Sequence, residues 1–240
     1  GFNPLLGVEN PVRPIKMVRE SYEMMKRMLA HDRTPYDGEF FKATSDLFFQ
    51  FEVLRPDMPI FIGTWGPKMA RMAGARASGF KADCTWNPKY LSHLRDQFFD
   101  GARSAGRDPE TLDVIVGPLC SISRDGAKAH DFIRDILALL QPALAPMTHN
   151  EGITDEEIMA AFEAHQAGDT EKAKSLVSDR AVRAFSVTGT PRDVIPQIED
   201  MINAGATHIA FGPPLGPDFD EALDLIATEV LPHFKGGRQV

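Results

Sequence analysis

A short apolar segment that ends in two closely spaced glycines and a proline is the part of the sequence best suited to bind an anion. It reads Ile60-Phe61-Ile62-Gly63-Thr64-Trp65-Gly66-Pro67-Lys68-Met69. A strand that passes through a glycine turn into a helix leaves the first backbone N–H groups of the helix without intrahelical partners, and such groups bind anions. The pattern therefore predicts a phosphate site, carried by the backbone N–H groups of Gly66 and Lys68. The same glycines also suit a plain strand-to-helix turn.

Two further positions are candidates for ligand contacts. Asn87 follows a predicted strand and precedes Pro88, so its side chain is suited either to bind a cofactor or to cap the helix that Pro88 begins. The segment Phe211-Gly212-Pro213-Pro214-Leu215 follows the last predicted strand and is suited either to shape a substrate pocket or to form a rigid turn. His208 is expected inside that strand as a core or structural histidine rather than a catalytic base. The residues themselves identify no catalytic group.

The composition excludes several classes of protein. The formal net charge of −8 argues against a dedicated nucleic-acid binder, which needs a dominant positive field. No apolar run approaches the roughly 20 residues that a membrane span requires. The histidines show no HxH or HExxH spacing, and Cys84 and Cys120 lie outside any CxxC pair, so no metal site is predicted. Two buried thiols are favoured over a disulfide between them.

The elements that must position these residues follow from hydrophobic periodicity and from the places of proline and glycine. Helices are predicted over residues 14–29, 67–77, 88–105, 125–140, 170–177 and 219–231, with two more that begin near Thr154 and at Pro191. Extended segments are predicted over residues 38–54, 58–62, 79–86, 112–116 and 208–211, and a loop over residues 212–217.

Strands and helices alternate through most of this order, which predicts a parallel sheet covered by helices. An open doubly wound sheet and a piece of a (β/α)8 barrel both fit, since only about four barrel-type strands are convincing where a full barrel has eight. Residues 142–184 break the rhythm and are predicted as a helical insert before the last β/α unit. The whole chain, residues 1–240, is expected to form a single partial-barrel domain.

Three motifs give the sequence a family resemblance: Gly63 with Gly66-Pro67-Lys68-Met69, then Gly189-Thr190-Pro191, and above all Phe211-Gly212-Pro213-Pro214-Leu215-Gly216-Pro217-Asp218. The chain resembles the luciferase-like superfamily, and within it the coenzyme F420-dependent methylenetetrahydromethanopterin reductases. The resemblance implies an α/β fold, a luciferase-like TIM (β/α)8 barrel. Gly1 aligns with a loop after roughly the fourth strand of the family, so the first strands of the barrel are expected to be absent from this chain.

The resemblance also implies site residues. F420, or FMN in other branches, is expected to contact Gly63, Thr64, Trp65, Gly66, Pro67, Lys68 and Asn87. The substrate is expected to contact Phe211, Gly212, Pro213 and Leu215.

The implied function is hydride transfer between reduced F420 and a methylene-tetrahydropterin one-carbon carrier, by a cytoplasmic enzyme that assembles as a dimer or tetramer. Two alternatives remain open at this stage. One is an FMN-dependent luciferase-like monooxygenase, and the other is a truncated flavin-binding protein without catalysis. The expected partner is a small-molecule substrate, with no nucleic acid and no membrane.

Overall fold

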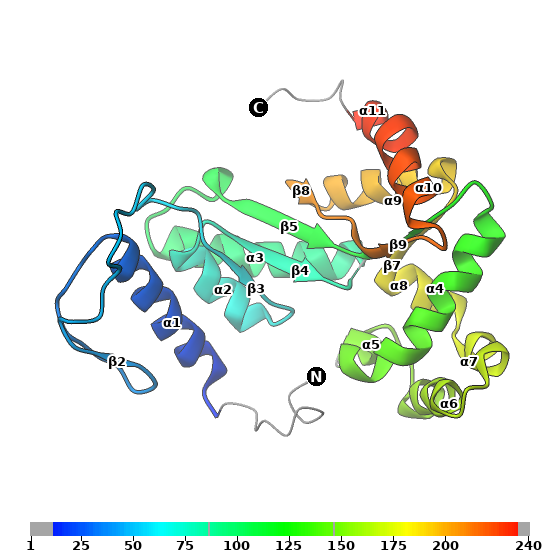
Figure 1. Ribbon diagram of the computed structural model, residues 1–240, viewed down its shortest axis with the longest axis horizontal. Helices are drawn as coiled ribbons and strands as arrows, with labels where there is room; N and C mark the ends of the chain where they lie inside the picture. The colour runs from blue at the N-terminus through cyan, green and yellow to red at the C-terminus, as the bar shows by residue number, and fades with distance from the viewer. Residues whose placement is uncertain (1–11, 86, 146, 235–240) are drawn as a thin grey trace. The chain divides into compact units, whose positions relative to one another are not determined.

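The computed structural model describes residues 12–85, 87–145 and 147–234, and the chain divides into two compact units. The larger unit contains residues 81–95 and 113–234, and the smaller unit contains residues 12–80 and 96–112. The division crosses strand β4 (Gly79–Asp83) and helix α3 (Pro88–Ser104), both labelled in Figure 1. The single domain expected over residues 1–240 stays a prediction.

Three neighbouring strands form part of one sheet in the larger unit. In this unit β4, β5 (Asp113–Gly117) and β8 (His208–Ile209) are neighbours in that order. β5 and β8 run parallel, with Ile115 opposite His208. All three strands correspond to predicted strands: β4 and β8 are shorter than predicted, and β5 is shifted by one residue. The parallel pairing of β5 and β8 confirms the predicted parallel arrangement for these two strands.

A second parallel sheet of the larger unit has β6 (Leu119–Ile122) at its centre. β7 (Ser186–Gly189) and β9 (Gly212–Leu215) pair with β6 on its two sides, and both pairs are parallel. Pro118 alone separates β5 from β6. Of these strands the sequence predicts only the β5 segment, because a proline without an N–H group hides the continuation of the strand.

β9 occupies a segment that was predicted to be a loop, and that prediction is wrong. Leu119 lies opposite Gly212 and Ser121 lies opposite Leu215, so β9 uses one residue more than β6 over the same step. This irregularity lies at Pro213-Pro214, whose nitrogen atoms cannot donate to a sheet. A strand at the edge of a sheet tolerates proline where it bulges, which is the reason the proline signal misleads here.

The larger unit is rich in helices, and none of the described helices of the chain combines the length and the apolar character that a bilayer crossing requires. The helices are α4 (Gly126–Leu140), α5 (Met147–Asn150), α6 (Asp155–Gln166), α7 (Thr170–Leu176), α8 (Asp179–Phe185), α9 (Pro191–Asn203), α10 (Phe219–Leu225) and α11 (Leu231–Phe234), with a 3-10 turn at Gln141–Leu144 and a π-helical turn at Ile226–Val230. Helices α5 to α8 fall in the segment predicted as a helical insert, but α8 and the strand that follows it were not predicted as separate elements.

Helix α4 covers the second sheet and forms much of the core of this unit. It packs on β6 and β7, where Ile133 and Leu137 of the helix and Ile122 and Val187 of the strands are buried. Burial of one such aliphatic side chain contributes about 1.5–3 kcal/mol relative to its exposure. The second sheet therefore rests on a well-packed helix.

The outer side of β7 is occupied by a side chain. The backbone N–H of Thr188 donates to Oε1 of Gln197 on α9 at 3.2 Å, and Nε2 of Gln197 donates back to the Thr188 carbonyl oxygen at 3.0 Å. The Gln197 amide thus makes the pair of hydrogen bonds that a neighbouring strand would make.

The smaller unit combines helices with short strands. Its elements are α1 (Pro14–Leu29), the antiparallel pair β1 (Tyr36–Asp37) and β2 (Lys42–Ala43), β3 (Phe61–Gly63), α2 (Pro67–Arg76), the first residues of β4, the second part of α3 and a 3-10 turn at Pro109–Thr111. Helices α1 and α2 confirm the prediction from periodicity. Both begin at a proline, which suits the first helical turn.

Residues 47–53, the second part of the segment 38–54 that was predicted to be extended, do not form a strand, and this part of the prediction is wrong. This segment has neither helical nor strand structure, and Phe51 is 64% exposed. The rings of Phe49 and Phe51 stack on each other with centroids 4.8 Å apart. The apolar side chains of this segment pack against each other locally. For this reason their alternation does not indicate a strand that pairs with another strand.

Helices α2 and α3 approach closely within the smaller unit at two glycines. A Cβ atom on Gly74 of α2 would lie 1.8 Å from the carbonyl oxygen of Phe98 in α3, and a Cβ on Gly101 of α3 would lie 1.9 Å from the carbonyl oxygen of Arg71 in α2. Both obstacles are backbone atoms, so the two helices meet at a distance that only glycine permits.

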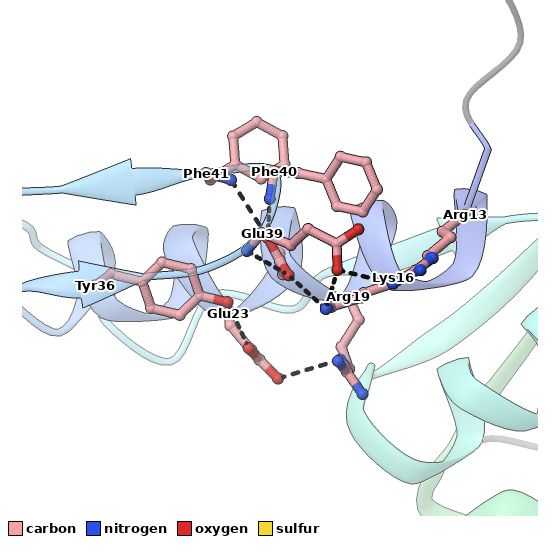
Figure 2. A network of polar contacts seen from close by, with 9 residues as sticks. Arg13, Lys16, Arg19, Glu23, Tyr36, Glu39, Phe40 and Phe41 are labelled. Carbon is pink, nitrogen blue, oxygen red and sulfur yellow. Dashed lines mark hydrogen bonds and ion pairs between the residues drawn. The ribbon is translucent and has the colours of Figure 1, made fainter.

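A buried carboxylate organises the turn between β1 and β2. Glu20 of α1 is 3% exposed, and its carboxylate accepts hydrogen bonds from the backbone N–H groups of Glu39, Phe40 and Phe41 at 3.1, 2.8 and 3.3 Å. Figure 2 shows this turn beside the basic side chains of α1, among them Lys16, which contacts Glu39. Burial acts to raise the pKa of the Glu20 carboxyl, but the hydrogen bonds from Phe40, Glu39 and Phe41 and the charge of Lys16 outweigh it and hold that pKa below its ordinary value.

Glu20→Gln is expected to lower the stability of the chain and to change how stability depends on pH. A group whose pKa is lowered by folding stabilises the folded state above its unfolded pKa, and this contribution is lost as the pH falls through the folded pKa. The difference in urea midpoint between wild type and Glu20→Gln is therefore expected to be full at neutral pH and to shrink below the ordinary pKa of 4.5. Glu52→Gln, at an exposed site of the same unit, is the control; a pH-independent difference for Glu20→Gln would contradict the assignment.

Candidate functional site

The N-terminus of α2 carries the predicted anion site in the smaller unit. Gly66 is the N-cap residue, Pro67 is the first helical residue, and the Ala70 N–H donates to the Gly66 carbonyl oxygen at 2.9 Å. The Gly66 N–H itself donates to Oγ1 of Thr64 at 2.9 Å. That N–H group is thus engaged within the turn, and helix geometry leaves the N–H groups of Lys68 and Met69 as the donors directed out of the helix.

The glycines of this turn are not explained by packing or by backbone conformation. A Cβ on Gly63 would meet no atom within 4 Å, and a Cβ on Gly66 would make only ordinary contacts at 3.7 and 4.0 Å. Gly66 has φ −97°, which any residue adopts. The absent side chains therefore leave open space beside the helix N-terminus, as the close approach of an anionic ligand requires.

The remaining residues of the turn complete this surface. Gly63 and Lys68 are exposed, whereas Thr64, Trp65 and Pro67 are half-buried. The Lys68 ammonium adds its charge to the partial positive charge of the helix N-terminus. The turn is therefore suited to hold a phosphate group through backbone N–H groups, one lysine and open space over two glycines.

Asn87 lies in the larger unit, and the structure confirms its cap interpretation. Its Oδ1 accepts the Tyr90 N–H at 3.0 Å at the start of α3, and its Nδ2 donates to Oε1 of Glu151 at 2.6 Å. The cap does not exclude a role toward a cofactor, which stays a prediction. Glu151 was not identified from the sequence, because 64 positions separate it from Asn87 and no spacing rule connects them.

The predicted substrate segment forms β9 of the larger unit. Phe211, Gly212 and Leu215 are half-buried and Pro213 is exposed. A Cβ on Gly212 would lie 2.5 Å from the Pro118 carbonyl oxygen, so this glycine has a packing role. Leu215 has φ +77°, a left-handed conformation that is rare for a residue with a side chain and is often found near functional sites.

The predicted site residues thus fall in both units. Gly63 to Lys68 form one continuous turn in the smaller unit, whereas Asn87 and the segment Phe211 to Leu215 belong to the larger unit. Within the larger unit, the Asn87 side chain is hydrogen-bonded to Glu151, which is not one of the predicted site residues.

The environments of His208 and the two cysteines agree with the predictions only in part. His208 lies in strand β8 as predicted, but its side chain is 59% exposed, with its Nδ1 3.5 Å from a carboxylate oxygen of Asp113. It is therefore not a core histidine, whereas the structural alternative fits its contact with Asp113. A residue in a two-residue strand at the end of the sheet order has little to cover it.

Cys84 and Cys120 are free thiols, which confirms the absence of a disulfide between them. Burial raises the pKa of the Cys120 thiol to about 12, so it is unreactive, while Cys84 is only half-buried.

A cavity of about 560 Å³ in the larger unit contains none of the predicted site residues. Its lining includes Thr188, Asp193 and Gln197. Asp193 accepts the N–H of Thr190 in a capping box at the start of α9, and Gln197 binds the backbone of β7. These polar groups are committed to the fold, and the cavity is not the candidate site.

Parallel β/α units define a β/α protein, and the open helix N-terminus that follows β3 is suited to a phosphorylated ligand. Comparison with known proteins is consistent with this class, since the sequence model of the luciferase-like monooxygenases matches residues 3–208. The chain therefore belongs to the luciferase-like family.

Individual relatives are similar over nearly the whole chain. The 5,10-methylenetetrahydromethanopterin reductase of Methanopyrus kandleri is 32% identical over 95% of this chain and 65% of its own length, and that of Archaeoglobus fulgidus is 29% identical over 93% and 68%. The solved structure of the coenzyme F420-dependent tetrahydromethanopterin reductase from Methanopyrus kandleri superposes with a TM-score of 0.84 at 30% identity. It is covered over 65% of its length, so the chain spans about two thirds of these relatives.

Proposed function

We propose that this chain is an F420-dependent oxidoreductase that transfers a hydride between reduced F420 and a methylene-tetrahydropterin one-carbon carrier. The observation that carries the proposal is its similarity, over 95% of its residues, to a protein named 5,10-methylenetetrahydromethanopterin reductase. Other relatives named F420-dependent glucose-6-phosphate dehydrogenase, such as that of Nocardia farcinica at 26% identity, favour the same cofactor.

The turn before α2 fits the phosphate of such a cofactor. The proposed contacts are Gly63, Thr64, Trp65, Gly66, Pro67 and Lys68 of this turn, together with Asn87. When bound, F420 supplies the hydride chemistry, and the residues of the protein bind and orient it. The backbone N–H groups of Lys68 and Met69 and the Lys68 ammonium hold the phosphate, and the two glycines admit it. Asn87 keeps one amide N–H beyond its bond to Glu151 for a further contact.

Phe211, Gly212, Pro213 and Leu215 are the proposed substrate contacts. They lie at β9, and active sites of β/α barrels are built at the carboxyl ends of the strands. Leu215 has a left-handed backbone conformation, which is rare for a residue with a side chain. Such conformations are common at ligand-binding sites, which supports its place among the substrate contacts.

Oxidation of reduced F420 in the presence of methylene-tetrahydromethanopterin tests the proposal. Purified chain is expected to oxidise reduced F420 only when the pterin is present, which is measured as the appearance of the absorption of oxidised F420. Absorption of oxidised FMN in the purified protein, with no F420 turnover, would favour the luciferase-like monooxygenase. Flavin or F420 binding with no turnover of any of these substrates would support a non-catalytic binding protein.

We also propose that the chain acts in the cytoplasm and self-associates as a dimer or tetramer. Phe51 and Leu54 of the smaller unit are 64% and 84% exposed, and apolar side chains of this size are often covered by a partner. Light scattering of the purified chain measures its oligomeric state directly, and a monomer at all concentrations would remove this part of the proposal.

A further inference from the structure

The carboxyl end of β4 combines features that the fold alone does not require. Cys84 has φ +49°, a left-handed conformation for a residue with a side chain, and its N–H donates to the Gly117 carbonyl oxygen at 2.7 Å. Thr85 is 3% exposed, and its Oγ1 has no hydrogen-bond partner among the described residues. Buried polar atoms in folded proteins almost always have partners, so an unpaired hydroxyl at a strand end points to a missing ligand or water.

Glu151 is brought to the same strand end and held there. Its Oε1 accepts Nδ2 of Asn87 at 2.6 Å. Its backbone N–H donates to the carbonyl oxygens of Met147 and Thr148 in α5, and its own carbonyl oxygen accepts a hydrogen bond from Nη1 of Arg180 at 3.3 Å. The side chain and the backbone are both anchored, so the carboxylate is preorganised.

The Glu151 carboxylate has acceptor capacity beyond its bond to Asn87. A carboxylate has about four lone-pair positions on its two oxygens, and Asn87 uses one of them. The residue is half-buried rather than solvated on all sides. A fixed, partly buried acceptor at the carboxyl end of a parallel strand is placed where β/α folds bind their ligands.

We propose that Glu151, positioned by Asn87 and assisted by the Thr85 hydroxyl, binds the amino-pyrimidinone edge of the pterin substrate. This inference rests on the proposed function. The pterin edge presents an amino group beside a ring N–H, two donors that match the two oxygens of a carboxylate. The corresponding edge of a flavin or deazaflavin presents one N–H between two carbonyl oxygens, which a carboxylate repels. The chemistry of Glu151 therefore selects the pterin and not the cofactor.

The test separates binding of the pterin from binding of F420 and from turnover. Glu151→Gln preserves the shape of the side chain and an oxygen for Asn87, and Thr85→Val removes the hydroxyl at constant volume. Tetrahydromethanopterin, which cannot accept the hydride, is titrated calorimetrically into each variant, and F420 is titrated by its fluorescence. Glu156→Gln, an exposed position at the start of α6, is the matched control. Thermal unfolding of each variant reports on folding.

Glu151→Gln is expected to raise the Kd for tetrahydromethanopterin about tenfold or more, because a charge-assisted pair of hydrogen bonds is lost. Its Kd for F420 and its Tm are expected to stay those of wild type, as are all values for Glu156→Gln. Thr85→Val is expected to weaken pterin binding less and to leave the Tm unchanged, since no protein partner of the hydroxyl is lost.

An unchanged Kd for tetrahydromethanopterin in Glu151→Gln would overturn the inference, and so would a wild-type chain that binds no tetrahydromethanopterin. A rise in the Kd for F420 that equals the rise for the pterin would also overturn it, because it would place Glu151 against the cofactor. A wild-type chain that binds tetrahydromethanopterin through Glu151 but oxidises no reduced F420 would refute the proposed function and leave this inference standing.

Discussion

Gly74→Ala is expected to destabilise the chain by about 3 kcal/mol, although alanine is the better helix former. Helix propensity alone favours alanine over glycine by about 1 kcal/mol. At this position the new Cβ would lie 1.8 Å from the Phe98 carbonyl oxygen, a backbone atom of α3 that cannot turn away. The steric cost exceeds the gain in propensity because the two helices have to separate along their whole contact. Urea unfolding followed by circular dichroism measures the difference.

Gly126→Ala is the control for this prediction. Gly126 is the first residue of α4, and its Cβ would make an ordinary contact of 3.4 Å with a methyl group of Thr190. The free energy of unfolding of this control variant is expected to stay within about 0.5 kcal/mol of the wild-type value. A Gly74→Ala variant as stable as the control would show that α2 and α3 are farther apart than described.

Gly63→Leu is expected to weaken the binding of F420 by about tenfold or more and to leave the stability of the chain unchanged. A Cβ at Gly63 meets nothing within 4 Å, so the folded chain accommodates the new side chain without strain. The leucine would fill the open space beside the N-terminus of α2, where the proposed phosphate contacts lie. Fluorescence titration of F420 and thermal unfolding of the same sample check the two halves of the prediction.

Two lysine variants sharpen this test. Lys68→Gln removes the charge at the start of α2 and is expected to weaken F420 binding in a manner that salt reduces, because a surface charge is screened by ions. Lys42→Gln removes the charge of β2 in the same unit, where Lys42 pairs with Asp37 at 2.8 Å, and is expected to leave F420 binding unchanged. Equal affinities of wild type and Gly63→Leu would remove the turn before α2 from the cofactor site.

Glycines 63 and 74 show where reasoning from the sequence reaches its limit. Both lie in or beside the same strand-to-helix segment, and the sequence does not separate a glycine that admits a ligand from one that admits a neighbouring helix. The distinction depends on atoms contributed by α3, far along the chain. The start of α2, in contrast, was predicted from sequence because its signals, Gly66 and Pro67, are local.

The strands show the same division between local and distant causes. The segment of β5 was predicted from its run of β-branched residues. β7 and β9 were missed because their identity as strands depends on pairing with β6, and Pro213 argues against a strand unless the bulge is known. Residues 47–53 were predicted as a strand because alternation alone does not reveal whether a partner exists.

The candidate site divides in the same way. The turn from Gly63 to Lys68 is continuous in sequence, and its anion-binding geometry follows from rules about helix ends. The cap formed by Asn87 was one of two interpretations that its position before Pro88 allowed. Glu151 had no signal in the sequence, because its partner Asn87 reaches it only through the fold of the larger unit.

The Gln197 amide that pairs with Thr188 has a consequence for solubility. The free edge of a sheet is a template on which a strand of another molecule can be added, and such addition leads to aggregates. With both backbone groups of Thr188 already bound to Gln197, β7 has no vacant pair of groups at that residue for an incoming strand. A single side chain of α9 thereby protects this edge from the addition of strands of other molecules when the protein is concentrated.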